Sequence, residues 1–293
     1  MIPLDVSCLG SCYKNTKPKD LFFSLMSLFL ESSKPKQVLL VIDGPIGKDL
    51  KKIIYYFVEN FKIQILDLKR NQGLGIALSK GLKKCKCNYV ARFDTDDINL
   101  PNRLEKQLQY LKNNPHISVV GSNVFEYRKI GNYYENRHKL VPESYKNISL
   151  FIYLRNCMNH PTVLFKKVDI LNIGSYKNRI YFEDYDLWLR LIDNNYKFAN
   201  LSESLVLMKR EDASIRREGF SYIKKEFLFI KKVDIKITKK LVLFFVFLLK
   251  VLLRVIFSSK VLNFLPWRTK WKRMNVECYQ RIKLLDNCYK THF

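Results

Sequence analysis

Short β-rich runs alternate with helix-length stretches through the first 125 residues, and this alternation limits the fold more than any other feature. The β-rich runs are Leu4–Leu9, Val38–Asp43, Ile63–Leu68, Tyr89–Phe93 and Ser118–Asn123. The stretches between them are Asp20–Leu30, Lys48–Phe61, Gly73–Cys85 and Pro101–Lys112. Because strand–helix–strand repeats build parallel sheets covered on both faces, the pattern predicts an α/β fold.

The pattern is looser after residue 125. It predicts strands at Thr162–Lys166, Tyr196–Leu201 and Leu205–Lys209, and a helix at Asp184–Asn194. After Glu218 we expect helix to the end, with breaks near Ser258 and Pro266.

Two features bear on compartment. The apolar run Leu21–Leu30 resembles part of a signal peptide, but it lies between two predicted strands, so we expect a buried helix. The seven cysteines are odd in number and irregularly spaced, which favours reduced cytosolic thiols over disulfides or a zinc site.

Basic charge is concentrated toward the C-terminus. The chain carries 52 basic and 27 acidic residues, a net charge of +25, and 21 of the basic but only 7 of the acidic residues follow Met208. Such an excess indicates an anionic partner, either nucleic acid or phospholipid, although a lysine-rich solvated surface would give the same count.

The run Leu241–Phe257 is apolar except for Lys250 and Arg254, which lie one helical turn apart. Downstream, aromatic and basic residues interleave at Trp267, Arg268, Lys270, Trp271, Lys272 and Arg273. This pattern favours a helix in the headgroup region of an anionic membrane over a core helix, and it leaves open whether the run lies on or spans the membrane.

Three carboxylates follow the predicted strand at Tyr89–Phe93. Asp94, Asp96 and Asp97 repel one another unless a positive group lies among them. Oxygen-only ligands suit Mg²⁺ or Mn²⁺, and such an ion commonly binds substrate phosphates as well. A helix start would explain one of these acids but not three.

Three further polar positions are candidates for the same edge of the sheet. Asp43 ends a strand and could accept a hydrogen bond from a base or ribose, or serve only in the turn. Glu183 and Asp184 open a predicted helix, where an acid could cap the helix or act as a general base. His160 could line the pocket, although a lone histidine is more often structural.

The motifs taken in chain order resemble a known family. They are Val-Ser…Tyr13, Ile-Asp-Gly-Pro45, Asn71-x-Gly-x-Gly, Ala-Arg-Phe-Asp-Thr-Asp-Asp97, Pro101-x-Arg103, Val-Gly-Ser122, His-Pro-Thr162 and Glu-Asp-Tyr-Asp-Leu-Trp188. From residue 4 to residue 210 the chain resembles the family 2 glycosyltransferases with the GT-A fold. It is most similar to the non-processive bacterial enzymes that build O-antigen, capsule and exopolysaccharide repeats.

The resemblance implies a division of the chain and a role for each matched residue. It implies a GT-A domain at residues 1–215, with a nucleotide-sugar part (1–125) and an acceptor part (126–215), followed by a basic helical membrane-association region (216–293). Asp184 matches the catalytic base, and Asp94 and Asp96 match the metal-binding D-x-D motif. The nucleotide-binding residues would be Ser11, Tyr13, Asp43, Arg70, Asn71, Gly73, Arg92 and Asp94, and the acceptor-side residues His160, Glu183 and Trp188.

The implied activity is inverting, Mn²⁺- or Mg²⁺-dependent transfer of a sugar from a nucleotide-sugar donor, preferably a UDP-sugar. The acceptor would be a saccharide or a lipid-linked saccharide at the cytoplasmic face of the plasma membrane. Three other classes compete: an inactive sugar- or membrane-binding protein on this fold, a nucleic-acid-binding protein, and a nucleotidyltransferase. The intact acids argue against the first, and no nucleic-acid motif supports the second.

Overall fold

The computed structural model describes residues 3–31, 33–210, 220–256 and 269–293. Within these ranges the strands form one ten-stranded sheet with the order β10-β7-β6-β8-β4-β1-β2-β3, and β9 pairs with β6 and β5. The strands are β1 (Leu4–Cys12), β2 (Pro35–Asp43), β3 (Gln64–Leu68), β4 (Tyr89–Arg92), β5 (Ile98–Asn99), β6 (Ile117–Ile130), β7 (Tyr133–Lys139), β8 (Leu164–Lys166), β9 (Lys197–Lys209) and β10 (Lys272–Arg273).

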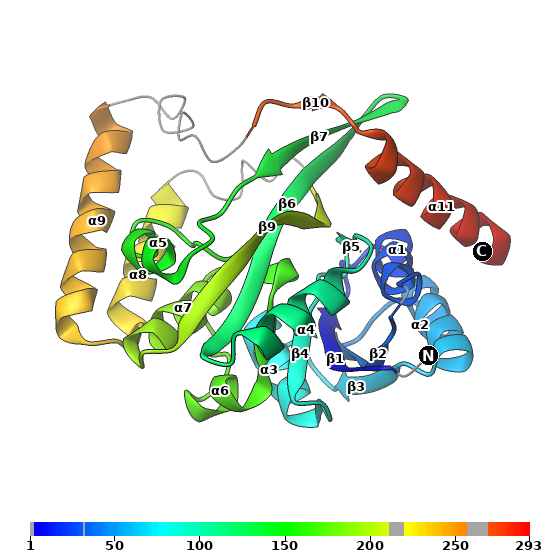
Figure 1. Cartoon of the computed structure of the whole chain (residues 1–293), viewed down its shortest axis with the longest axis horizontal. Coiled ribbons are helices and arrows are strands. Elements are labelled where there is room, and N and C mark those ends of the chain that lie inside the picture. The colour runs from blue at the N-terminus through cyan, green and yellow to red at the C-terminus, as the bar shows by residue number, and fades with distance from the viewer. Residues whose placement is uncertain (1–2, 32, 211–219, 257–268) are drawn as a thin grey trace.

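Helices cover both faces of this sheet (Figure 1). They are α1 (Pro18–Phe29), α2 (Lys48–Phe61), α3 (Leu74–Lys84), α4 (Arg103–Asn113), α5 (Tyr145–Phe151), α6 (Lys167–Asn172), α7 (Glu183–Asp193), α8 (Phe220–Lys232), α9 (Ile237–Ile256) and α11 (Val276–His292), with a 3-10 helix, η1, at His160–Thr162. One hydrophobic core joins the sheet to α1, α2, α4 and α11, and a second joins it to α3, α7, α8 and α9. The α/β prediction is therefore confirmed.

The first half of the sheet is parallel, as the alternation predicts. β1 pairs in parallel with β2 and β4, and β2 pairs in parallel with β3. The carboxyl ends of β1, β2 and β4 therefore meet at one edge, where the chain continues into Tyr13, Gly44 and Asp94. The run Leu21–Leu30 is a buried helix, α1, whose Leu21, Phe22 and Leu25 are fully buried.

The second half of the sheet is mixed. β8 pairs antiparallel with both β4 and β6, and β6 forms an antiparallel hairpin with β7. The two short strands expected around residues 196–209 are one strand, β9, whose register against β6 shifts near Ser122 and Asn123. Exposed Ser202 and Glu203 interrupt the hydrophobic pattern at this shift, which explains the prediction of two strands.

The C-terminal segment returns to the N-terminal half. β10 pairs antiparallel with β7, and Trp271 lies between the guanidinium groups of Arg128 and Arg137, 4.3 and 4.4 Å from their centres. Trp271 is therefore held by protein rather than offered to a membrane. Helix was expected here instead of β10, because a strand of two residues has no hydrophobic periodicity that a sequence could show.

Helix α11 packs against α1 at the end of the molecule where both termini lie (Figure 1). The ring of Phe22 contacts those of Tyr289 and Phe293, and Arg281 donates a hydrogen bond to the carbonyl oxygen of Ser27. Residues 276–292 are thus part of the main core. The predicted boundary at residues 215 and 216 and the expected breaks at Ser258 and Pro266 lie outside the described residues, as do Trp267 and Arg268.

Two adjacent leucines of α11 test this packing. Leu285 is fully buried, whereas Leu284 is 46% exposed. We expect Leu285→Ala to lower the free energy of unfolding by about 2–5 kcal/mol, because it removes buried methyl groups and leaves a cavity. Leu284→Ala should change it by less than about 1 kcal/mol. Urea denaturation measures both, and equal effects would show that α11 does not pack on the core.

Helices α8 and α9 stand side by side at the opposite end of the molecule (Figure 1). Phe227 of α8 contacts the rings of Phe244 and Phe247 on α9, and Phe229 stacks on Phe182 with ring centres 4.7 Å apart. Among the described residues, no helix is both long enough and apolar enough to span a membrane.

Candidate active site

Three carboxylates follow β4 and converge. One oxygen atom from each of Asp94, Asp96 and Asp97 lies within 4.8 Å of the others. Burial, followed by repulsion from Asp94, raises the pKa of Asp96 to about 6, although this residue is the most exposed of the three. Because all the donors are oxygen atoms held close together, the cluster fits Mg²⁺ or Mn²⁺.

Arg92, the last residue of β4, is the positive group nearest this cluster. Its Nη2 atom lies 2.5 Å from Asp94 Oδ1, and its side chain is almost fully buried. Its Nε and Nη1 atoms are buried and, within the described residues, have no hydrogen-bond partner. A buried guanidinium with unused donors is costly without an acceptor, so this arrangement suits an anionic ligand.

Asp97 is the structural member of the cluster. Its Oδ1 atom accepts a hydrogen bond from the Lys209 backbone N–H, and the Lys209 ammonium group pairs with both oxygens of Asp20. Burial and repulsion from Asp96 and Asp94 raise the pKa of Asp97 well above its usual value. Asp97 thus ties the end of β9 to the loop after β4, and Asp94 and Asp96 are the acids left for a ligand.

Asp43 connects the ends of β2 and β3. Its two carboxylate oxygens accept hydrogen bonds from the backbone N–H groups of Gln72 and Gly73, and Asn71 Nδ2 donates to its carbonyl oxygen. Gly44 has a φ of +88°, and a Cβ there would collide with the Asn71 nitrogen. Asp43 therefore holds the 71–73 loop against the turn after β2. Its predicted contact with a base remains a prediction.

The remaining donor-side candidates surround this loop. Tyr13 is 41% exposed, so part of its side chain is accessible to a ligand. Ser11 is partly buried at the end of β1, and Arg70 is exposed ahead of Asn71. The topology therefore brings β1, β2, β3 and β4 together with their candidate residues at one edge of the sheet.

The second acidic cluster opens α7. Asp184 Oδ2 accepts a hydrogen bond from Asn156 Nδ2, and Oδ1 accepts one from the Tyr185 backbone N–H. Burial and the neighbouring Asp184 raise the pKa of Glu183 to about 7, with smaller effects from Arg92 and Asp94. The two acidic clusters are thus electrostatic neighbours, with Arg92 interacting with both.

The His160 side chain lies behind this region rather than at its surface. His160 is buried, and its Nε2 atom is 3.1 Å from the Tyr176 hydroxyl. Burial and then Arg92 lower the pKa of His160 well below its usual value. Trp188 is fully buried and packs against the rings of His160 and Phe198, and its place on the acceptor side remains a prediction.

Sequence reasoning missed three residues at this site. Tyr176 is buried and interacts electrostatically with Arg92, Asp184 and Glu183, and Asn156 orients Asp184. Arg103 was noted only as part of a motif, yet its buried guanidinium donates a hydrogen bond to the carbonyl oxygen of Arg92. Tyr176 and Asn156 have no local pattern that marks them, and the motif around Arg103 does not reveal its contact with Arg92, because each of these contacts joins distant segments.

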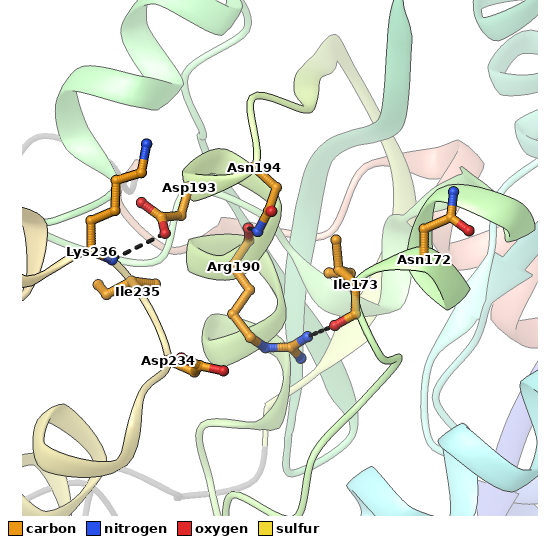
Figure 2. A pocket seen from close by; sticks show the side chains of 8 residues that line it. All are labelled: Asn172, Ile173, Arg190, Asp193, Asn194, Asp234, Ile235 and Lys236. Carbon is orange, nitrogen blue, oxygen red and sulfur yellow. Dashed lines mark hydrogen bonds between the residues drawn. The ribbon is translucent and has the colours of Figure 1, made fainter.

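A cavity lies away from these acids. It has a volume of about 500 Å³ and lies at the C-terminal end of α7, beside the turn between α8 and α9 (Figure 2). Arg190 donates to the Ile173 carbonyl oxygen there, and Asp193 accepts from the Lys236 N–H. Asp184 and Asp193 are nine residues apart on α7, about 14 Å along the helix, so this cavity is separate from the acidic site.

Comparison with known proteins decides the family. A model of glycosyl transferase family 2 matches residues 12–171, more than half of the chain. The chain belongs to glycosyltransferase family 2. The resemblance inferred from the motifs is thereby confirmed, and so is the classification as a glycosyltransferase. Asp43, Asp94 and Asp96 lie within the matched range and Asp184 lies beyond it.

Relatives of this family 2 glycosyltransferase act in polysaccharide synthesis. The amylovoran biosynthesis glycosyltransferase AmsE of Erwinia amylovora is 38% identical over 221 residues, 75% of this chain and 82% of the relative. An Escherichia coli UDP-Gal:alpha-D-GlcNAc-diphosphoundecaprenol beta-1,3-galactosyltransferase is 33% identical over 218 residues, 74% and 78% of the two chains. The E. coli O-antigen biosynthesis glycosyltransferase WbnJ is 30% identical over 220 residues, 74% and 84%.

Solved structures confirm the GT-A fold. Residues 1–349 of S. aureus TarS, in complex with UDP-GlcNAc, superimpose with a TM-score of 0.60 at 17% identity, covering 88% of this chain and 74% of that fragment. The mannosyltransferase PcManGT from Pyrobaculum calidifontis, in complex with GDP-Man and Mn²⁺, gives 0.59 at 10% identity, covering 89% and 79%.

Proposed function

We propose that this chain transfers a sugar from a UDP-sugar to a saccharide acceptor during the synthesis of a surface polysaccharide. The observation that carries the proposal is the convergence of two acidic clusters on Arg92, whose buried Nε and Nη1 donors lack partners among the described residues. The relatives in amylovoran and O-antigen synthesis support the pathway, and the UDP-GlcNAc complex of TarS supports the donor class.

The donor lies at the carboxyl edge of the parallel strands in this proposal. Tyr13 stacks on the base, and the loop held by Asp43 lies beside it with Asn71 and Gly73. Ser11 and Arg70 lie next to these groups, and Arg92 donates to the diphosphate. Asp94 and Asp96 would hold Mn²⁺ or Mg²⁺, which when bound neutralises charge on the departing diphosphate.

Asp184 is the general base in this proposal. The acceptor oxygen forms a bond to the anomeric carbon while the bond from that carbon to the β-phosphate oxygen breaks. The proton of the acceptor hydroxyl goes to Asp184, and the nucleoside diphosphate leaves with the electron pair. Asn156 and the Tyr185 N–H fix the orientation of the carboxylate, and Glu183 and His160 lie on the acceptor side.

A single displacement inverts the anomeric configuration. Proton NMR of the reaction with an α-linked UDP-sugar should therefore show a β-linked product at the start of the reaction. A product that retains the α configuration would contradict the assignment of Asp184 as a base.

The division of labour along the chain is part of the proposal. Residues 1–125 supply the donor side and residues 126–215 the acceptor side. The basic region 216–293 contributes through α8 and α9 at a membrane surface, since β10 pairs with β7 and α11 packs in the core.

The outer face of α9 supports membrane association. It carries six large apolar side chains that are between 45% and 67% exposed: Leu241, Val242, Phe245, Leu248, Leu249 and Leu252. Residues 220–256 contain nine basic and two acidic residues, a balance that suits anionic lipid. We propose that the enzyme lies on the cytoplasmic face of the plasma membrane through this helix.

Vesicle binding tests the membrane proposal. We expect Phe245→Glu combined with Leu249→Glu to weaken binding to phosphatidylglycerol-containing vesicles about tenfold or more, since both side chains leave the lipid. Leu284→Glu makes the same kind of change on α11 and should have little effect. Equal binding by the double variant and the unmodified chain would refute the α9 surface.

A further inference from the structure

A second, smaller groove adjoins the candidate active site. It has a volume of about 290 Å³ and lies between the loop that precedes α7 and one face of α8. The loop contributes Asn178, Arg179, Ile180 and Phe182, and α8 contributes Lys225, Leu228, Phe229 and Lys232. The four α8 residues are spaced i, i+3, i+4 and i+7, so they share one face of the helix.

The loop connects this groove to both sides of the proposed reaction. At one end Phe182 is followed directly by Glu183 and the proposed base Asp184. At the other end the Lys177 carbonyl oxygen lies so close to Gly75 that a Cβ there would collide with it. A ligand in the groove would therefore lie next to the acceptor side of the site without occupying the donor side.

The groove is apolar on its floor. Phe182 stacks on Phe229 with ring planes 11° apart, and both are buried. Ile180 is 73% exposed and Leu228 is 41% exposed. A hydrocarbon chain that lay along the groove would cover these two exposed apolar side chains.

The groove is cationic along one edge. The Lys225 ammonium group lies 4.6 Å from the centre of the Tyr181 ring rather than against a carboxylate, and Lys232 is exposed. Arg179 pairs with the buried Asp186 and donates a hydrogen bond to the Lys232 carbonyl oxygen. Three cationic side chains thus line the groove, those of Arg179, Lys225 and Lys232, and this positive charge suits a diphosphate.

We infer that this groove binds the diphosphate and the first isoprene units of a lipid-linked acceptor. The diphosphate lies along Arg179, Lys225 and Lys232, and the hydrocarbon lies on Ile180 and Leu228. The inference rests on the proposed function and deepens it. A relative uses a diphosphoundecaprenol-linked acceptor, which has this combination of anion and hydrocarbon. Helix α9 packs on α8 and keeps its apolar outer face exposed. This face would direct the lipid tail toward the membrane.

Binding of farnesyl diphosphate to the full chain tests the inference. Titration calorimetry without divalent metal should show binding at least tenfold tighter than that of either pyrophosphate or farnesol. Lys225→Glu combined with Lys232→Glu should weaken farnesyl diphosphate binding at least tenfold. Leu228→Ser should weaken it without changing pyrophosphate binding. Lys224→Glu, a charge reversal outside the groove lining, should change it less than twofold.

Three results would overturn the inference. An effect of Lys224→Glu equal to that of the double variant would indicate only general electrostatic attraction. Displacement of farnesyl diphosphate by UDP with Mn²⁺ would place it in the donor site. Loss of binding to phosphatidylglycerol vesicles in the double variant, with farnesyl diphosphate binding retained, would assign the groove to phospholipid headgroups. Binding of UDP with Mn²⁺, measured on the unmodified chain and on every variant, tests the proposed function separately. If the unmodified chain binds farnesyl diphosphate but not UDP, the proposed function fails and the inference about the groove does not.

Discussion

Asp184→Asn is expected to lower kcat at least 100-fold and leave the dissociation constant of the UDP-sugar unchanged. A general base contributes about 10²–10⁴-fold to such reactions, and an amide cannot accept the proton of the acceptor hydroxyl. Asparagine has the same shape, and its carbonyl oxygen can still accept the hydrogen bond from Asn156. Steady-state kinetics and calorimetry with a UDP-sugar measure the two quantities.

Glu183→Gln is the matched control for this substitution. Glu183 is the neighbouring acid, and its pKa of about 7 makes it the competing candidate for the base. We expect this variant to keep kcat within about tenfold of the unmodified enzyme. The opposite result, with Glu183→Gln inactive and Asp184→Asn active, would move the role of base to Glu183.

Asp96→Ala is expected to abolish the metal dependence of donor binding and lower kcat/KM at least 100-fold. Asp96 is the exposed member of the acidic cluster, so its removal takes away a proposed ligand without opening a cavity. Since Asp94 repels Asp96, the free energy of unfolding without metal should stay equal or rise. Calorimetry of UDP binding with and without Mn²⁺ checks the first expectation, and urea denaturation checks the last.

Asp67→Ala serves as the control for Asp96→Ala, because Asp67 is an exposed acid on β3 outside the cluster. If Asp96→Ala and Asp67→Ala both keep metal-dependent UDP binding, Asp96 is not a metal ligand. Asp97 is unsuitable as a control, since its carboxylate holds the Lys209 backbone and its loss would disturb β9.

The donor half of the fold could be predicted from sequence because its signals are local. Each parallel strand is a short apolar run, and each candidate acid follows the end of such a run, as at Asp43 and Asp94. Topology then requires those ends to meet, so the acidic cluster could be placed without knowledge of side-chain contacts.

The rest of the molecule depends on contacts between distant segments. β10 is only two residues long and is defined by its pairing with β7, more than 130 residues earlier in the chain. The interleaved aromatic and basic pattern around Trp271 favoured a membrane contact, but Arg128 and Arg137 enclose that ring. A sequence shows which residue types are present, not which of them already have partners.

Trp188 and Tyr176 show the same limit within the site. The acidic motif that begins α7 correctly marks Glu183 and Asp184 as candidates, yet Trp188 lies a little over one turn further on and faces the core. Tyr176 stands in a loop without any motif, and only the fold brings it next to His160 and Arg92.

Thermal stabilisation of the purified chain by nucleotides, with and without Mn²⁺, tests the proposed donor site. UDP should raise the melting temperature only when Mn²⁺ is present, by more than GDP or CMP does, and this shift should disappear in Asp96→Ala. The absence of a shift with every nucleotide tested would contradict a donor site at Asp94 and Asp96, and would favour an inactive binding protein on the GT-A fold.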